Sequence, residues 1–162
     1  MRTGYIHRGR RLGVLGCVVG SAALTLMAIE IGATSTAASQ KSLTVWDGVY
    51  TVAQAERGKV AFSRRCSFCH GEDLDGSEDP GGPTLLGSVF LSHWDGLSMS
   101  EIFATVGETM PQNRPATVPT EELAEILSFL LHANKIPPGQ RELPDDPSDL
   151  QDILFVARPE KR

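Results

Sequence analysis

The sequence predicts a small all-α domain, because three segments combine a helix-starting cap with an apolar face of helical period. These segments begin at Thr51, Ser98 and Thr120. The chain has 162 residues, which is enough for one domain with extensions at its ends. We expect about three to five helices within residues 51–137.

The first predicted helix begins after Thr51 and runs directly into Cys66. Gln54 stands three residues after Thr51, as in a capping box. Gly58 and Phe62 fall on one face of this helix. A glycine inside a helix costs about 1 kcal/mol relative to alanine. Its presence here indicates that another element approaches closely at Gly58.

The helix leads into the pentapeptide Cys66-Ser67-Phe68-Cys69-His70. A C-x-x-C-H sequence is the attachment signature of c-type haem. Two cysteines three residues apart lie on one side of a helical turn, so both sulfurs can form thioether bonds to one porphyrin edge. His70 then lies where it can ligate the iron. The motif predicts one covalently attached haem c.

An acidic, turn-rich loop follows from Glu72 to Gly82. Its carboxylates partly match a calcium-binding loop, but Glu78 and Thr84 occupy positions that need glycine and glutamate. We therefore expect a solvated loop. A ligating histidine usually donates its second ring N–H to a carbonyl or carboxylate. We expect the carbonyl of Pro83 to accept that hydrogen bond.

The second predicted helix begins after Ser98, where Glu101 completes a capping box, and ends at Gly107. Met110 follows on a loop stiffened by Pro111. A thioether on such a loop suits a His/Met haem, so Met110 is the expected sixth ligand of the iron.

Three other side chains compete with Met110 for the sixth position: Met99, His93 and His132. We expect Met99 to pack in the core, as most methionines do. His93 is expected to be hydrogen-bonded or exposed. His132 lies near a helix end, where a cation is favoured.

The third helix has a wide apolar stripe, is expected to be capped by Thr120 and ends before Pro137-Pro138-Gly139. Residues 138–162 form a tail in which Ser148 and Gln151 predict a capping box and a short helix. The tail either folds back on the domain or docks a partner. Residues 39–50 have no clear period and are interpreted as a linker, with Trp46 and Tyr50 able to pack on the domain.

Residues 1–38 have the pattern of an export signal, with a basic start, an apolar run and small residues around Ala37 and Ala38. A retained membrane anchor is the alternative. The whole chain has a formal charge of −5. Removal of four arginines and Glu30 with the signal would leave about −8. This negative charge argues against nucleic acid and anionic lipid as partners.

With these motifs in view, residues 51–136 resemble the class I cytochrome c family through CSFCH, GPTLLG, the TMP around Met110 and an aromatic at Phe129. The resemblance implies terminal helices that cross near Gly58 and the aromatic, with the haem between them. It also implies Met110 as the distal ligand and the Pro83 carbonyl as the proximal hydrogen-bond acceptor. The stretches VWDGVYT and MPQNRPATVPTEELAEILSFLLHANKIPPG are similar to small cytochromes associated with bacterial quinoprotein (PQQ-type) dehydrogenases.

The function expected from these residues is one-electron transfer, because a His/Met haem leaves no open position for a substrate. We expect a periplasmic carrier that passes electrons from a dehydrogenase to a terminal acceptor and is not an enzyme. Its partners would be redox proteins, with no nucleic acid, and no membrane unless residues 1–38 are retained. A cytochrome subunit bound tightly in a respiratory or quinoprotein dehydrogenase complex is the alternative.

Two further classes stay open. Cys66, Cys69, His93 and His132 could in principle bind zinc, or the C-x-x-C pair could exchange thiols, although their spacings and surroundings suit neither use well. A haem enzyme or gas sensor would require that Met110 not bind the iron.

Arg64, Arg65 and Arg114 flank the motif and the expected distal ligand. They are either solvated surface charges or a positive rim that steers an acidic redox partner.

Overall fold

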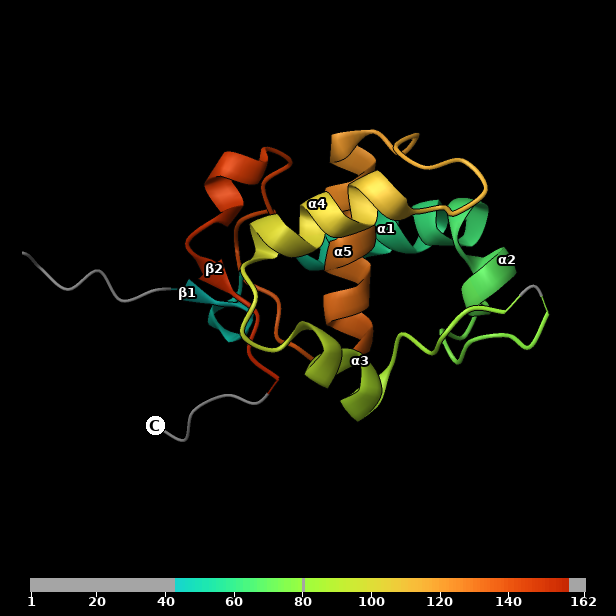
Figure 1. Cartoon of the computed structure of the whole chain (residues 1–162). Coiled ribbons are helices and arrows are strands. Elements are labelled where there is room, and N and C mark those ends of the chain that lie inside the picture. The colour runs from blue at the N-terminus through green and yellow to red at the C-terminus, as the bar shows by residue number, and fades with distance from the viewer. Residues whose placement is uncertain (1–42, 80, 158–162) are drawn as a thin grey trace, which may run out of the picture. The chain divides into compact units, whose positions relative to one another are not determined.

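The computed structural model describes residues 43–79 and 81–157. The expected export signal lies outside the described residues. Within them, five α-helices account for most of the regular structure, as the sequence predicts. They are α1 (Val52–Arg65), α2 (Ser67–His70), α3 (Gly87–Trp94), α4 (Met99–Thr109) and α5 (Thr120–Ala133) (Figure 1).

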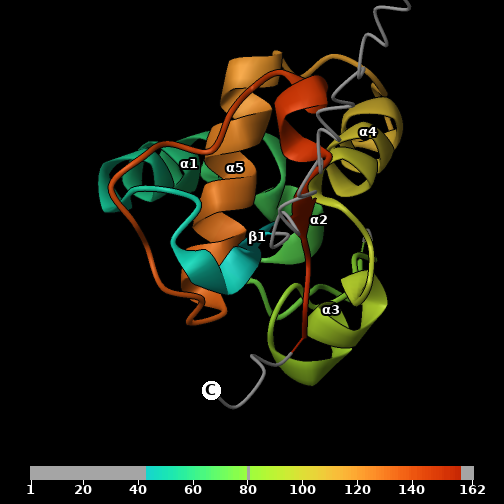
Figure 2. The ribbon, with the colours of Figure 1, turned by 90° about the vertical axis from the view of Figure 1, so that its left-hand side faces the viewer.

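Helices α1 and α5 cross steeply at the centre of the described fold (Figures 1 and 2). The crossing point is Gly58, where a Cβ added to the glycine would lie 1.8 Å from the carbonyl oxygen of Glu125. One turn further along α1, the ring of Phe62 packs on Phe129 with 5.4 Å between centroids. The close approach inferred from a mid-helix glycine is confirmed. It is the contact that sets the two helices against each other.

The start of α4 is as predicted, and its end is not. Ser98 and Glu101 form the full capping box, and the side chain of Ser98 accepts from the Glu101 N–H. The prediction that Gly107 ends the helix is wrong, because α4 continues to Thr109. The reason for the glycine is packing, since Gly107 lies against α5, and a Cβ added there would meet Leu123 Cδ2 at 3.0 Å.

Two other helix predictions need correction. Helix α3 is missing from the predicted elements, because Gly87 to Trp94 begins without a side-chain cap and follows a loop rich in turn residues. Thr120 does not cap α5 but is its first residue, with Pro119 at the N-cap and no capping side-chain hydrogen bond. The acidic first turn of Glu121 and Glu122 is as expected.

The described part of the expected linker, residues 43–50, is an integral layer of the fold. Strand β1 (Leu43–Thr44) leads into the 3-10 turn η1 (Val45–Asp47). Val45 and Tyr50 are completely buried, and the indole N–H of Trp46 donates to the carbonyl of Val156 at 2.7 Å. These contacts explain why the segment is ordered despite its lack of sequence period.

The described tail folds back on the domain, which is one of the two outcomes expected. It forms the 3-10 turn η2 (Pro147–Leu150) and then β2 (Ile153–Leu154), which pairs in parallel with β1. The predicted Ser148–Gln151 capping box is wrong. Asp146 caps η2 instead, accepting from the Ser148 N–H at 2.9 Å.

The core lies where α1, α4 and α5 meet the N-terminal layer and the tail. Its largest side chains with almost no exposed surface include Tyr50, Phe62, Met99 and Phe155. Within residues 43–157, excluding the undescribed position 80, no helix combines the length and apolar character required to span a membrane.

Candidate haem site

The C-x-x-C-H motif forms a single turn where α1 ends. Cys66 separates α1 from α2, and its carbonyl accepts from the N–H groups of Cys69 at 3.1 Å and His70 at 3.0 Å. Both Cys66 and Cys69 are free thiols of intermediate exposure. The turn therefore holds the two sulfurs and the imidazole within five consecutive residues of fixed backbone.

The imidazole of His70 is oriented by the loop that follows. Its Nδ1 lies 3.0 Å from the carbonyl oxygen of Pro83. A carbonyl can only accept, so Nδ1 carries the hydrogen, and in the neutral imidazole Nε2 then has the free lone pair that a metal ligand needs. A ring held in this way through its far nitrogen is typical of a metal-ligating histidine.

Backbone and hydroxyl contacts hold the loop against the motif. The N–H of Gly76 donates to the His70 carbonyl at 2.9 Å, and Ser77 Oγ donates to the Cys69 carbonyl at 2.7 Å. Gly82 lies so close that an added Cβ would be 2.1 Å from the Cys69 carbonyl oxygen and 3.2 Å from His70 Nδ1. Only glycine allows this approach, which delivers the Pro83 carbonyl to His70.

Met110 is the C-cap of α4, where its N–H donates to the Val106 carbonyl at 2.9 Å. The residue is partly exposed, and a cis peptide bond joins it to Pro111. In Figure 1 this end of α4 and α2 lie on the same side of the drawing. Met110 is thus placed by the end of a capped helix.

The three alternative ligands differ in their surroundings. Met99 is 1 % exposed and belongs to the core, as expected. His93 is exposed on α3, with its ring 4.5 Å from that of Trp94. His132 Nδ1 lies 3.3 Å from the hydroxyl of Tyr50.

The sequence profile of the family described as "Cytochrome C oxidase, cbb3-type, subunit III" matches residues 53–130. That range contains the cysteine motif, the Pro83 loop, Met110 and most of both crossing helices. Residues 53–130 form a c-type cytochrome domain. No curated protein and no solved structure matches the chain. The cytochrome domain binds haem c covalently and is an electron-transfer protein rather than an enzyme.

The described residues fit that cofactor. Two free thiols share one turn, the His70 ring has its Nδ1 hydrogen bond satisfied, and a glycine makes room for the proximal loop. When bound, haem supplies an iron centre that changes oxidation state by one electron. The zinc alternative has no support, because no group of three or more potential metal-ligating His, Cys, Asp or Glu side chains occurs in the described part of the chain.

Burial raises the pKa of the Cys66 thiol to about 11, and the nearby Arg65 opposes this effect. A raised pKa lowers the fraction of reactive thiolate, which counts against thiol exchange at Cys66.

The two arginines before the motif are less free to attract a redox partner than the sequence indicates. Both Arg64 and Arg65 form ion pairs with the same Glu122 carboxylate of α5. One glutamate therefore offsets part of the positive charge of the expected rim. The sequence gives no sign of this pairing, because Glu122 stands there only as an acidic residue at a helix start.

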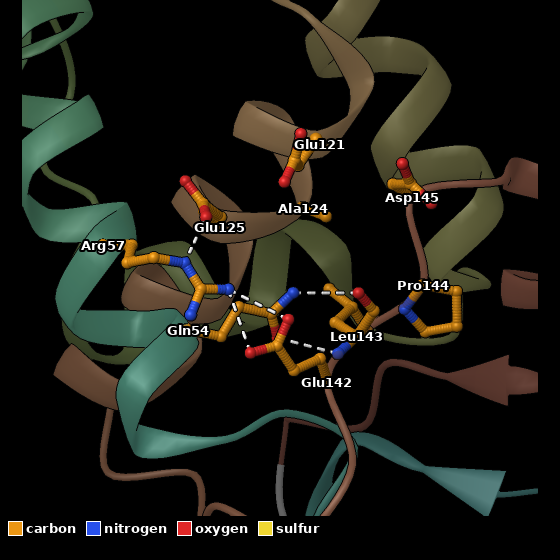
Figure 3. A pocket seen from close by; sticks show the side chains of 9 residues that line it. All are labelled: Gln54, Arg57, Glu121, Ala124, Glu125, Glu142, Leu143, Pro144 and Asp145. Carbon is orange, nitrogen blue, oxygen red and sulfur yellow. Dashed lines mark hydrogen bonds and ion pairs between the residues drawn. The ribbon is translucent and has the colours of Figure 1, made fainter.

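A polar pocket lies between α1, α5 and the tail (Figure 3). Its lining includes Gln54, Arg57 and Glu125 but none of the haem-motif residues of the cytochrome domain. Arg57 crosses it to pair with Glu125 and Glu142. The pocket is therefore part of the tail attachment and not a cofactor site.

Proposed function

We propose that Cys66 and Cys69 carry the haem through thioether bonds and that His70 and Met110 are its axial ligands. The observation that supports this most strongly is the 3.0 Å contact between His70 Nδ1 and the Pro83 carbonyl. This hydrogen bond favours the tautomer whose Nε2 can bind the iron, and it makes the imidazole a more basic ligand.

A methionine sulfur as the second ligand favours reduced iron and raises the reduction potential relative to a second nitrogen ligand. With both axial positions filled, the iron has no place for a substrate. The chemistry of the site would then be single-electron transfer, with His70 and Met110 retained in both oxidation states.

The first test is a haem stain of a denaturing gel, followed by visible spectra of the exported protein. Stain that survives denaturation would support thioether attachment. Sharp low-spin reduced bands and the far-red ferric band of Met–iron ligation would support the His/Met pair. Loss of all covalent stain would overturn the proposal.

A matched pair of substitutions tests the choice of methionine. Met110→Leu should abolish the far-red band and let the reduced protein bind carbon monoxide. Met99→Leu, a change of similar volume in the core, should leave both properties as in the wild type. The reverse pattern would assign the sixth position to Met99.

We further propose that the protein works as an exported, periplasmic carrier that takes electrons from a dehydrogenase, with a quinoprotein dehydrogenase as one candidate donor. Covalent haem attachment takes place after export, which agrees with the signal pattern of residues 1–38. Fractionation with N-terminal sequencing of the haem-stained product tests this. A start near residue 39 supports export with cleavage, and cytoplasmic recovery contradicts it.

A second candidate is a subunit of a respiratory complex, which is favoured by the oxidase-subunit description of the matching family. Purification in mild detergent separates the two candidates. A free carrier would migrate at its own mass, about 17.5 kDa or less after cleavage. A complex subunit would migrate with a much larger haem-containing assembly.

A further inference from the structure

We propose that residues 143–156, here called the C-terminal strap, position α4 so that Met110 stays within reach of the haem iron. This inference rests on the proposed function, because it takes Met110 to be the sixth ligand. Within the strap, Leu150 and Phe155 are the positioning residues. Neither is proposed to touch the haem.

The strap is first fixed to α1. The buried amide of Gln54 donates to the Leu143 carbonyl at 2.9 Å and accepts from the Leu143 N–H at 2.7 Å (Figure 3). The hydroxyl of Ser128 on α5 donates to the same Gln54 oxygen at 2.9 Å. This pairing ties the start of the strap to the α1–α5 crossing. These hydrogen bonds therefore fix the position at which the strap begins.

The strap then packs on α4. Turn η2 lies beside α4 in both views (Figures 1 and 2). Leu150 is the buried residue of η2 and has no exposed surface, so we assign this packing mainly to its side chain. Full burial of a leucine side chain is a substantial favourable contribution to folding. The contact is therefore large enough to influence where α4 rests.

The end of the strap fixes the turn that leads into α4. The Phe155 N–H donates to the Leu97 carbonyl at 2.8 Å, and the Gly96 N–H donates to the Phe155 carbonyl at 2.9 Å. Leu97 directly precedes Ser98, the N-cap of α4. The Phe155 ring also packs edge-on against Phe90 of α3, with 6.1 Å between centroids.

Helix α4 transmits this position to Met110. It is uninterrupted from Met99 to Thr109, and Met110 is the next residue. At a rise of about 1.5 Å per residue, α4 is roughly 16 Å long. A thioether is a neutral, weak ligand, so its occupancy of the iron depends on how often the protein holds it in place. Loosening the start of α4 should lower that occupancy.

Two leucines of the strap provide a matched test. Leu150 belongs to η2, which packs beside α4, and the backbone of Leu143 is hydrogen-bonded to Gln54 of α1; the two leucines are 0 % and 2 % exposed. The haem-loaded variants Leu150→Ala and Leu143→Ala are titrated in the ferric state with imidazole, which competes with Met110. Weaker Met ligation lowers the apparent Kd for imidazole by the same factor.

We expect Leu150→Ala to lower that Kd about tenfold and to weaken the far-red band, and Leu143→Ala to change it by less than about twofold. Thermal unfolding of both variants measures their general loss of stability. Similar unfolding temperatures with different imidazole Kd values would support positioning. Equal changes in Kd, or no change in either variant, would overturn it.

The wild-type spectrum is recorded first, because it separates the two proposals. Absence of the far-red band in the wild type would refute Met110 ligation and the strap inference with it. Its presence together with an unchanged Leu150→Ala would refute the strap alone. If Leu150→Ala gives no haem-loaded protein, Leu150→Val and Leu143→Val allow the same comparison with a smaller truncation.

Discussion

Gly58 of α1 touches the backbone of Glu125 of α5 so closely that a Cβ would stand 1.8 Å from the Glu125 carbonyl oxygen. The group that meets Gly58 is backbone and not a movable side chain. A side chain added at Gly58 could therefore be accommodated only by moving one of the two helices as a whole. The contact also sets how far the end of α1, and with it Cys66, lies from α5.

Gly58→Ala should therefore destabilise the protein. Alanine gains about 1 kcal/mol in helix propensity, but overpacking against the α5 backbone should cost more, for a net loss of roughly 2 kcal/mol. At about 4–8 °C per kcal/mol, the unfolding temperature should fall by roughly 10 °C. Thermal unfolding followed by circular dichroism of the haem-loaded protein measures this.

Gly107→Ala in α4 is the control, because its Cβ would meet only the flexible end of the Leu123 side chain, at 3.0 Å. The same propensity gain applies there, and Leu123 can rotate away. We expect Gly107→Ala to change the unfolding temperature by only a few degrees. Equal effects at the two glycines would contradict a special role for the helix crossing.

Features that depend on local chemistry could be predicted from the sequence. The cost of glycine inside a helix indicated the Gly58 crossing, and the Ser98–Glu101 pair predicted the start of α4. The need of a ligating histidine for a hydrogen-bond acceptor led to Pro83, whose carbonyl does lie at hydrogen-bond distance from His70. Each of these requirements is expressed within a few residues of the sequence.

Features that depend on distant contacts could not be predicted. Gln54 has the sequence position of half a capping box, but its side chain is buried and binds Leu143, 89 positions away. Residues 43–50 show no period because their order comes from contacts with the tail, such as the β1–β2 pairing and the Trp46–Val156 hydrogen bond. Glu122 pairs with Arg64 and Arg65 only because α5 crosses α1. In each case the partner is supplied by the tertiary fold.

Gln54→Leu should detach the strap from α1. The substitution keeps the side chain's approximate size but removes the partners of the Leu143 N–H and the Leu143 carbonyl, whereas the Ser128 hydroxyl keeps the Ala124 carbonyl as its acceptor. Buried polar groups left unpaired cost about 1–3 kcal/mol each, offset in part where water reaches them. We expect a loss of about 2–4 kcal/mol in the free energy of unfolding, measured by urea denaturation.

Gln151→Leu is the control for that change, since Gln151 is an exposed residue of the same tail. Its effect should stay within about 0.5 kcal/mol. Hydrogen exchange adds a local readout, because the Leu143 amide should lose protection in Gln54→Leu. A fully protected Leu143 amide in that variant would contradict the assigned pairing.

Gly82→Ala should reduce covalent haem attachment. The added Cβ would overlap the Cys69 carbonyl oxygen at 2.1 Å and press on His70 Nδ1 at 3.2 Å, so the loop must withdraw the Pro83 carbonyl from His70. Loss of the hydrogen-bond partner of a ligating histidine typically costs about 10–100-fold in metal affinity or activity. Haem-stain intensity per unit of protein measures the attachment yield, which we expect to fall severalfold.

Gly81→Ala is the neighbouring control. Its Cβ would meet nothing closer than the Glu78 carbonyl at 3.6 Å, although its φ of +87° adds backbone strain. That strain costs roughly 1–2 kcal/mol and does not involve the motif. Attachment should therefore stay near the wild-type yield. Equal loss in both variants would point to loop strain rather than to the His70 contact.

Tyr50 should make stability depend on pH in the alkaline range. Its side chain is completely buried, and its hydroxyl donates to the Ile136 carbonyl at 2.5 Å. Burial raises the pKa of Tyr50 from 10.0 to about 12. Between these values tyrosine ionises in the unfolded chain but stays neutral in the folded protein. Rising pH therefore favours unfolding, and the stabilisation present below pH 10 is lost towards pH 12.

Tyr50→Phe should separate this effect from all other alkaline titrations, because those are shared with the wild type. Below pH 10 the variant should be less stable by about 1–2 kcal/mol, since the Ile136 carbonyl loses its donor. Between pH 10 and 12 only the wild type bears the free-energy cost of keeping Tyr50 neutral, so the difference should shrink or reverse. Urea denaturation of both proteins across this range provides the measurement. A difference that stays constant up to pH 12 would show that Tyr50 keeps an ordinary pKa in the folded protein.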